Sequence, residues 1–337
     1  MCDPGLPLRG RLAPSPTGRI HLGNAFAFLM AWAFVRKAHG VLVMRVEDID
    51  PVRSREHFVQ GVLDDLHWLG LDWDEGPGCM NKGGAEATPH GPFGPYQQSR
   101  AFALYTAALD VLHSAALVYP CFCTRKDLKT LASAPHLEDG SPVYDGRCRR
   151  LAPAEREKRM AQGRYTLRLD VATAIHSGGL PPETPAGTIE GLLQAGDFAL
   201  MRSDGVPAYQ LAVVVDDGRM GITQVVRGND LAASTPRQKL LLSLLGYTPP
   251  EYIHIPLLYA QDGERLAKRH NSLEIAALRE KGVRPEQIVG LLAWLAGCNP
   301  AKSAMPARQF LADCNLDLVA RRQRIVLPSP AEALFFW

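Results

Sequence analysis

Hydrophobic and polar positions follow a regular pattern in the first part of the chain. Residues 9–13 have the length of a short strand, and residues 23–39 are apolar on almost every helical face, which is typical of a helix packed on a parallel sheet. Residues 41–47 indicate a buried strand. Residues 53–69 carry one apolar helical stripe, and residues 71–73 return as a strand. The pattern predicts β-α-β-α-β, which is half of a doubly wound α/β fold with parallel strands.

The later part of the chain predicts an insertion followed by a return to the sheet. Loops rich in glycine and proline separate the periodic segments at 76–95 and 177–187. The expected helices are 97–115, 154–162, 285–297 and 307–323. The expected strands are 165–170 and 197–202. Two apolar blocks, at 207–217 and 220–230, lead back to the sheet. We therefore expect four parts, with boundaries at 1–115 (first half of the sheet domain), 116–195 (inserted subdomain), 196–260 (second half) and 261–337 (C-terminal helical portion).

Composition narrows the class of protein. With 337 residues, 46% of them hydrophobic, the chain can bury one large core or two moderate ones. It has no apolar run of about 18 residues and no signal-like N-terminus, so we expect a cytoplasmic protein without membrane contact. The net charge of +2 is nearly neutral, so any RNA contact must come from a local basic face. G-x-G-x-x-G and Walker A motifs do not occur in the sequence, which speaks against dinucleotide enzymes and P-loop NTPases.

The segment between the first strand and the first helix carries the strongest chemical signal. From Arg11 to Asn24 it reads Arg-Leu-Ala-Pro-Ser-Pro-Thr-Gly-Arg-Ile-His-Leu-Gly-Asn. Two prolines and Gly18 predict a fixed open loop, and the first turn of the following helix offers backbone N–H groups to a phosphate. His21 can donate a hydrogen bond to a phosphoryl oxygen. A plain turn with a histidine at a helix start would give the same string, so the interpretation depends on what else the chain carries.

Two groups of charged residues add to this interpretation. Glu47, Asp48 and Asp50 follow the second strand, at the sheet edge where open α/β folds bind ligands. Arg265-Leu-Ala-Lys-Arg, with Lys268 as its central lysine, is a basic segment that can meet phosphate charge. An acidic surface turn and a solvated basic loop are the respective alternatives.

Three of the seven cysteines have a spacing that suits a metal ion. Cys121 and Cys123 are two residues apart, and Cys148 follows Tyr144 after a long polar stretch. Zinc takes four ligands, and thiolates at this spacing can reach one ion from a strand or turn. Buried thiols without metal would look the same, because this spacing is weaker evidence than paired C-x-x-C motifs. An odd number of cysteines in such a chain favours thiols or metal ligands over a disulfide framework.

Together the motifs resemble those of class I aminoacyl-tRNA synthetases, specifically the glutamate-activating branch. Arg11 to Gly18 with His21-Leu-Gly-Asn resembles the HIGH signature, the residues around Glu47 resemble an Arg-x-Glu-Asp-x-Asp motif, and Arg265-Leu-Ala-Lys-Arg resembles the KMSKS loop. The resemblance implies a Rossmann-like doubly wound parallel sheet with a zinc-bearing insertion and a short C-terminal helical portion. The chain departs from the family at Arg265, Ala267 and Asn229, where lysine, serine and often glutamate are expected.

The resemblance also implies roles for individual residues. His21 and Lys268 would stabilise phosphate charge, with Asn24 completing the ATP site at the helix start. The glutamate site would consist of Arg11, Ser15, Glu47, Tyr209 and Arg227, with Glu47 as partner of the substrate ammonium. One structural zinc ion would be held by Cys121, Cys123, Tyr144 and Cys148, with His136 or Asp145 as substitutes for the tyrosine. Magnesium is expected with ATP, although the sequence holds no dedicated protein cage for it.

The length of the chain points to a shortened branch of this family. Full glutamyl-tRNA synthetases continue with an anticodon-binding region of about 150 residues or more, for which we expect no room here. The resemblance to the shortened paralogues implies activation of glutamate with ATP in the absence of tRNA, and then transfer of glutamate to queuosine in the anticodon of tRNA(Asp). We expect a monomer. The alternatives are a minimal glutamyl-tRNA synthetase that charges a tRNA 3′ end, a non-catalytic RNA-binding paralogue, and another class I nucleotidylyltransferase.

Overall fold

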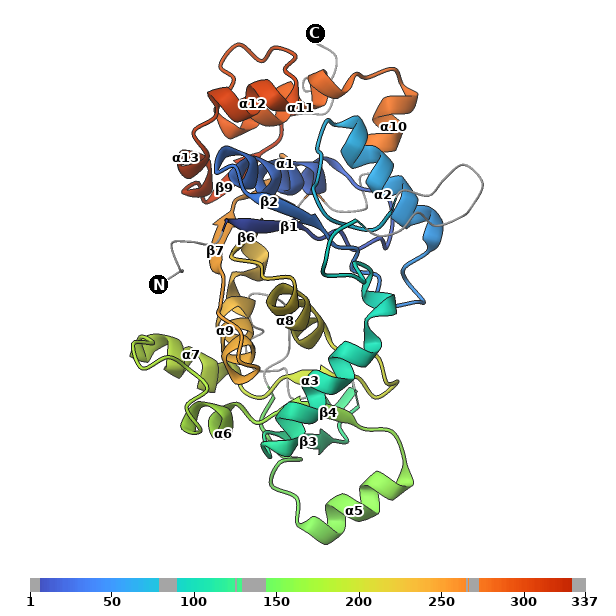
Figure 1. Ribbon diagram of the computed structural model, residues 1–337, viewed down its shortest axis with the longest axis vertical. Helices are drawn as coiled ribbons and strands as arrows, with labels where there is room; N and C mark the ends of the chain where they lie inside the picture. Colours follow the sequence, from blue (N-terminus) through green and yellow to red (C-terminus); the bar gives the residue numbers. More distant parts are fainter. Residues whose placement is uncertain are drawn as a thin grey trace. The chain divides into compact units, whose positions relative to one another are not determined.

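The computed structural model describes residues 7–78, 90–124, 126–128, 144–264, 266 and 273–328. The chain forms two compact units, whose elements Figure 1 labels. The first unit is drawn from Met1–Arg100, Ile222–Asn229 and Pro250–Trp337, and the second from Ala101–Gly221 and Asp230–Pro249. The division into four parts at 1–115, 116–195, 196–260 and 261–337 stays a prediction.

The first unit contains the parallel strands that the opening pattern predicts. β1 (Arg9–Leu12) pairs in parallel with β2 (Val41–Met44), and α1 (Leu22–Lys37) connects them. Later in the chain, β6 (Gln224–Gly228) pairs in parallel with β7 (Glu251–Ile255). β6 lies beside β1 in Figure 1, and the backbone N–H of Thr223 donates to the Arg9 carbonyl at 2.9 Å. The predicted β-α-β unit of an α/β fold is therefore confirmed.

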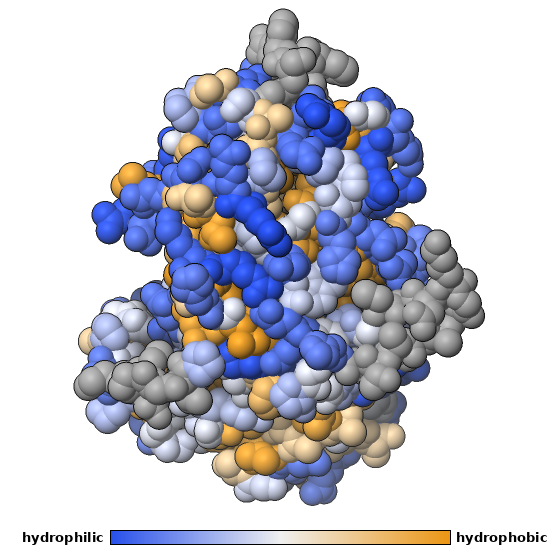
Figure 2. Space-filling view, turned by 45° about the horizontal axis from the view of Figure 1, so that its top comes forward, coloured by the Kyte–Doolittle hydropathy of each residue, from blue (hydrophilic) through white to orange (hydrophobic). Residues whose placement is uncertain are grey.

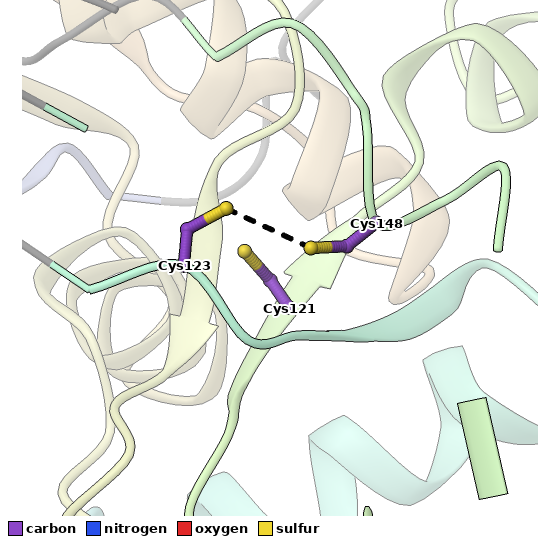
Figure 3. A group of neighbouring side chains, drawn as sticks. All are labelled: Cys121, Cys123 and Cys148. Carbon is purple, nitrogen blue, oxygen red and sulfur yellow. Dashed lines mark hydrogen bonds between the residues drawn. The ribbon is translucent and has the colours of Figure 1, made fainter. Parts of the chain in front are cut away.

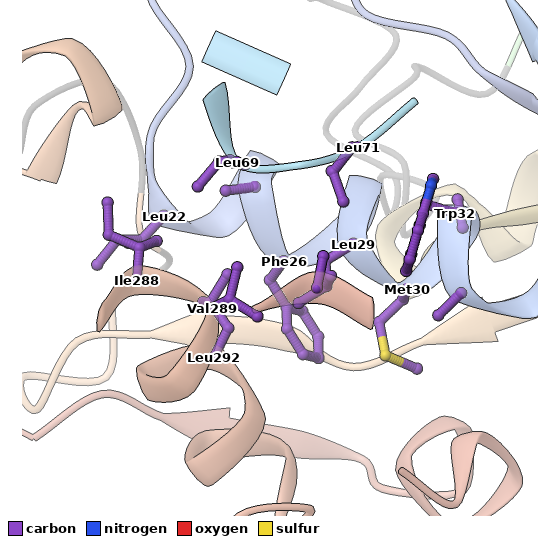
Figure 4. Close-up of a cluster of buried hydrophobic side chains, with 14 of the residues drawn as sticks. Leu22, Phe26, Leu29, Met30, Trp32, Leu69, Leu71, Ile288, Val289 and Leu292 are labelled. Atoms are coloured by element: carbon purple, nitrogen blue, oxygen red, sulfur yellow. The ribbon is translucent and has the colours of Figure 1, made fainter. Parts of the chain in front are cut away.

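α1 lies at the centre of the hydrophobic core of this unit. It contacts β1, β2 and β6, and Figure 4 shows Leu22 and Phe26 close to Ile288, Val289 and Leu292 of α11 (Pro285–Ala296). Because α1 is covered by strands and by helices, apolar residues occupy most of its faces, as its sequence pattern predicts. Burying each large apolar side chain contributes about 1.5–3 kcal/mol. The packing of α1 therefore fixes the position of the loop that precedes it.

The predicted strand at 71–73 is wrong. These residues form no strand, and an isolated parallel bridge joins Val43 to Glu75 just beyond them. The reason is Asp74, whose carboxylate accepts the Leu42 backbone N–H at 2.7 Å while its own N–H donates to the Leu42 carbonyl at 2.9 Å. This side chain takes a hydrogen bond that a neighbouring strand would otherwise make. The regular structure here is β-α-β followed by α2 (Glu56–Trp68).

The second unit contains an antiparallel sheet and several helices. β3 (Val118–Cys121), β4 (Thr166–Leu169) and β5 (Ala199–Met201) pair in that order. The helices are α3 (Phe102–Ser114), α5 (Pro153–Gln162), α6 (Val171–His176), α7 (Ala186–Ala195), α8 (Tyr209–Arg219) and α9 (Thr235–Leu244). Two 3₁₀ turns, η1 (Gln98–Arg100) and η2 (Asn229–Ser234), precede α3 and α9. The predicted strands at 165–170 and 197–202 and the predicted helix at 154–162 are confirmed, with small changes at their ends.

The C-terminal segments differ from the sequence prediction in two ways. Residues 307–323, predicted as one helix, form α12 (Ala307–Asp313) and α13 (Leu316–Ala320), because the Asn315 side chain accepts the Leu318 N–H and starts a new helix. Cys298 and Cys314 are joined in a disulfide, so the expectation of thiols or metal ligands is wrong for these two residues. The remaining described elements are α10 (Ile275–Glu280) and the parallel pair of β8 (Leu257–Tyr259) and β9 (Arg324–Val326).

The surface is largely polar. Hydrophilic side chains cover most of the face that Figure 2 shows. Large exposed apolar residues such as Val52, Val111 and Leu318 belong to separate segments of the chain. Within the described ranges, no helix combines the length and the hydropathy needed to cross a membrane.

Asp65 is a charged residue among the buried positions of α2. It is 5% exposed, and burial raises the pKa of its carboxyl from 3.8 to about 6, although the charges of Arg279 and Arg19 oppose this shift. A raised carboxyl pKa means that the folded state favours the protonated form. Above pH 6 the ionised carboxylate of Asp65 therefore lowers the free energy of unfolding. This loss disappears as the pH falls towards the pKa that Asp65 has in the unfolded chain.

We expect Asp65→Asn to stabilise the protein at pH 7.5 by about 1–2 kcal/mol, because the variant keeps the side-chain shape and removes the buried charge. Thermal unfolding at pH 7.5 should show a melting temperature that is a few degrees higher, and the gain should shrink by pH 4.5. Asp64→Asn, the exposed neighbour, is the matched control and should change little. A gain that is independent of pH would contradict this assignment.

Candidate active site and metal centre

The loop between β1 and α1 places His21 at the N-terminus of α1. The Nδ1 atom of His21 accepts the Gly23 N–H at 3.1 Å, and the His21 N–H donates to the Asn24 side-chain carbonyl at 3.2 Å. This reciprocal capping box fixes the imidazole. Because Nδ1 is the acceptor, the ring proton lies on Nε2, which makes Nε2 a hydrogen-bond donor. A β carbon at Gly23 would lie 2.9 Å from Cε1 of His21, so the ring position requires a glycine there.

This loop is held by backbone hydrogen bonds on both sides. The Glu47 N–H donates to the Pro14 carbonyl at 2.9 Å, and the Ile275 N–H donates to the Ile20 carbonyl at 2.9 Å. His21 also forms an isolated bridge with Glu274. The turn before α1 is thus tied to the end of β2 and to the start of α10, which follows the predicted lysine loop.

β1 and β6 bring together two of the predicted glutamate-binding residues. Arg11 is 6% exposed and Arg227 is 5% exposed. Nη1 of Arg11 donates to the Val226 carbonyl at 3.3 Å, directly before Arg227 in the chain. The Arg227 guanidinium lies 4.8 Å from the ring centre of Tyr252 on β7, a residue that the sequence analysis did not single out. Two buried guanidinium groups on neighbouring strands provide a cationic environment that suits a carboxylate ligand.

Glu47 and Ser15 also lie together, but Glu47 has a partner that the sequence analysis missed. The Ser15 hydroxyl lies 3.5 Å from Oε2 of Glu47, and Nη2 of Arg45 donates to Oε1 of Glu47 at 3.0 Å. Arg45 is fully buried, so its charge balances that of Glu47 inside the unit. A substrate ammonium would share this carboxylate with Arg45. The sequence does carry a sign of this ion pair, namely an arginine within the apolar run 41–46, because arginine is seldom buried without a partner.

The roles of all predicted site residues stay predictions, and two of the residues are not placed beside the others. Lys268 lies outside the described residues, as do Arg265, Ala267 and Arg269. Tyr209 belongs to the second unit, where it begins α8 and is 38% exposed. The contribution of Asn24 to ATP binding is also a prediction, although its side chain holds the backbone of His21.

Cys121, Cys123 and Cys148 form a cluster in the second unit, as Figure 3 shows. Their ligand atoms all lie within 4.8 Å of one another, and the sulfur atoms of Cys123 and Cys148 are 3.7 Å apart. Cys121 ends β3, whereas Cys148 approaches from the turn after Gly146. The predicted grouping of the three thiols is confirmed, and together they can serve as ligands of one metal ion.

Tyr144 adjoins this cluster. It is buried, and its hydroxyl oxygen accepts the Cys148 backbone N–H at 2.9 Å. The guanidinium of Arg168, on β4, lies 4.2 Å from the centre of the Tyr144 ring. Burial disfavours the thiolate of Cys121, but the hydrogen bond with Tyr144 and the charge of Arg168 outweigh burial and lower the pKa of Cys121. Burial, together with the neighbouring thiols, raises the pKa of Cys123 to about 12.

Arg168 is the residue that the sequence analysis missed at this centre. It is buried, and it donates to the Asp197 carbonyl at 3.2 Å. Three thiolates around a divalent cation carry a net negative charge, which this guanidinium would balance. The proposed substitutes for Tyr144 gain no support: Asp145 is paired with Arg147 at 3.0 Å, and His136 lies outside the described residues.

Comparison with solved structures identifies the fold. The structure is similar to a glutamate-tRNA synthetase from Elizabethkingia anophelis, with a TM-score of 0.70 at 22% identity, over 96% of this chain and 68% of that chain. This likeness establishes a class I synthetase fold. The chain belongs to the family of class I tRNA synthetases (E and Q), because residues 7–313 match the catalytic domain of that family.

Three of the curated relatives compared with this chain share one name, glutamyl-Q tRNA(Asp) synthetase. The chain is 54% identical to a glutamyl-Q tRNA(Asp) synthetase from Nitratidesulfovibrio vulgaris, over 87% of each chain. It is 47% identical to a protein of the same name from Symbiobacterium thermophilum, over 86% of this chain and 87% of the relative. Identity to the glutamate–tRNA ligase 2 of Syntrophus aciditrophicus is 40%, over 85% of this chain and 57% of the relative.

Proposed function

We propose that this protein activates glutamate with ATP in the absence of tRNA and transfers the glutamyl group to queuosine in the anticodon of tRNA(Asp). The observation that carries the proposal is the identity of 54% and 47% to two glutamyl-Q tRNA(Asp) synthetases, against 40% to a glutamate–tRNA ligase. The site supports the activation step, because Arg11 and Arg227 are buried on neighbouring strands close to the loop of His21.

In the first step, an oxygen of the glutamate α-carboxylate attacks the α-phosphorus of ATP. The bond to pyrophosphate breaks, and glutamyl-adenylate forms. Such a step asks the protein for alignment and for neutralisation of charge. His21 donates a hydrogen bond from Nε2–H to a phosphate oxygen at the start of α1, and Lys268 neutralises charge that grows on the pyrophosphate. Magnesium bound with ATP would supply further charge neutralisation and keep several water ligands.

The glutamate is held by its charged groups. Arg11 and Arg227 bind the side-chain carboxylate, while Glu47, supported by Ser15 and Arg45, receives the ammonium. Tyr209 is a further proposed glutamate-binding residue. In the second step, a cyclopentene hydroxyl of queuosine attacks the carbonyl carbon of the adenylate, AMP leaves, and an ester forms.

We expect purified protein to catalyse glutamate-dependent exchange of pyrophosphate into ATP with no tRNA present. Glutamine should be at least ten- to a hundredfold poorer, because a neutral amide loses a charge-assisted hydrogen bond worth about 1.5–3 kcal/mol. Arg227→Gln should abolish most of this preference. Arg202→Gln, which removes the half-buried partner of Asp204 in the second unit, is the matched control. Absence of exchange with glutamate, glutamine and aspartate alike would refute the enzymatic proposal.

The cysteine cluster is proposed to hold one structural zinc ion, with Tyr144 as the fourth ligand. Thiolates select zinc among the common cellular cations, and four protein ligands leave no position open for water. The contact of the Tyr144 hydroxyl with Cys148, and the charge of Arg168 nearby, support this ligand set. Such an ion would stabilise the second unit rather than take part in the reaction.

We expect about one zinc ion per chain by metal analysis. Cys148→Ser should lower both the zinc content and the melting temperature, because a structural zinc site contributes directly to folding free energy. Cys298→Ser, which opens the disulfide with Cys314 in the other unit, is the control and should leave the zinc content unchanged. Full zinc occupancy in a variant with both Cys121→Ser and Cys123→Ser would show that the ligands lie elsewhere.

A further inference from the structure

A cavity of about 630 Å³ lies in the first unit between α2 and α10. Phe58 and Asp65 of α2 line it on one side, and Arg279 and Glu280 of α10 line it on the other. Arg19, from the loop that leads to His21, completes the rim. These residues have no assigned part in the proposed reaction.

Asp65 is the buried polar group of this cavity. It is 5% exposed and lines the cavity, and within the described parts of the chain its carboxylate has the charges of Arg279 and Arg19 nearby but no hydrogen-bond donor. Buried carboxylates normally have hydrogen-bond donors around them, because removal from water is otherwise costly. The cavity therefore contains a charged acceptor that a ligand can satisfy.

The positive charges of the lining have other partners besides Asp65, on which both of them also act. Nη1 of Arg19 pairs with Oε1 of Glu280 at 3.4 Å, and the guanidinium of Arg279 lies 5.5 Å from the centre of the Trp68 ring. Arg19 and Arg279 face the carboxylates of Asp64, Asp65 and Glu280, so the lining has one net negative charge. A ligand that complements it is a cation.

The side chains that line the cavity favour an organic cation over a metal ion. Magnesium and calcium take six or more oxygen ligands, whereas one buried carboxylate is available here and two guanidinium groups stand nearby. The Phe58 ring offers an apolar, π-bearing surface, which attracts ammonium groups and alkyl or aryl carbon.

We propose that this cavity binds a small organic cation whose ammonium or amidinium group donates hydrogen bonds to Asp65 while its carbon skeleton packs against Phe58. The ligand would contact α2, α10 and Arg19 together. Because the Ile275 N–H at the start of α10 donates to the Ile20 carbonyl, the ligand would stabilise the same segment that holds His21.

The test is isothermal titration calorimetry with two pairs of probes that differ in charge. n-Butylammonium and benzamidinium should bind, and n-butanol and benzamide should bind at least tenfold more weakly, because they lack a charged donor. Affinity for the cations should rise about tenfold from pH 5 to pH 7.5, as Asp65, with a pKa of about 6, becomes ionised. Other charged or titratable groups also face this region, so the pH dependence must be assigned with variants. These groups are His57 and Asp64 on α2, Glu274 before α10, and Arg19, Arg279 and Glu280.

Asp65→Asn should lower the affinity for both cations at least tenfold and remove the rise with pH. Asp110→Asn, an exposed aspartate of α3 in the second unit, should change the affinity less than threefold, and melting curves confirm that both variants are folded. No binding of either cation, equal binding of the neutral analogues, or unchanged binding by Asp65→Asn would overturn the proposal. Binding of Mg²⁺ at this site in place of the organic cations would overturn it as well. The measurement needs neither glutamate nor tRNA, so its outcome is independent of the proposed synthetase activity.

Discussion

An anticodon stem-loop of tRNA(Asp) that carries queuosine is expected to accept glutamate from this protein in the presence of ATP, although the stem-loop has no 3′ acceptor end. The acceptor in the proposed reaction is a hydroxyl on a loop nucleotide. Unstacked loop bases are the parts of RNA that a protein pocket can read by edge contacts and stacking. Labelled glutamate should therefore appear on the stem-loop in a base-labile ester linkage.

The matched control is the same stem-loop with guanosine in place of queuosine, which should accept no glutamate because it lacks the cyclopentene hydroxyl. Intact tRNA(Asp) that carries queuosine should still accept glutamate after its terminal adenosine is removed. If label instead appeared only on intact tRNA(Glu), and removal of its terminal adenosine abolished it, the protein would be a glutamyl-tRNA synthetase that charges the 3′ end. Exchange without transfer to either RNA would exclude both activities.

Replacement of His21 by asparagine is expected to lower the rate of glutamyl-adenylate formation by about 10²–10³, the usual cost of removing one preorganised donor from a developing negative charge. The structure makes this variant informative. His21 acts as N-cap through Nδ1, and asparagine is among the best N-cap residues, so helix α1 should retain its cap. What the variant loses is the donor at Nε2.

The rate of pyrophosphate exchange and the Michaelis constant for glutamate separate the two roles of His21. A loss confined to the transition state lowers the maximal rate and leaves glutamate binding almost unchanged. His113→Ala, at the exposed end of α3 in the second unit, is the control and should keep full activity. An unchanged exchange rate in His21→Asn, with an unchanged melting temperature, would show that the HIGH-like segment serves only to cap α1.

The sequence by itself determined the parts of the fold that depend on local pattern. The apolar run of α1, the short strands β1 and β2, and the crossover between them follow from periodicity and from the proline- and glycine-containing loop. The grouping of Cys121, Cys123 and Cys148 was predicted from the spacing of the first two and from the family resemblance, whereas the pairing of β3 with β4 is seen only in the structure. The motif around His21 can be recognised in the sequence because its chemical groups lie within a few consecutive residues.

Only the tertiary structure decided which partners the buried charges have. Asp74 satisfies the backbone of Leu42 and so replaces the predicted strand at 71–73, and Asn315 divides the predicted helix at 307–323 in two. Arg168 beside Tyr144 pairs residues whose contact has no local signature in the sequence, and the burial of Arg45 against Glu47 is seen only in the structure. The disulfide of Cys298 and Cys314 and the burial of Asp65 likewise depend on how the chain folds. Periodicity reports which side of an element is apolar, whereas the partner of a buried polar group depends on distances between segments that only folding brings together.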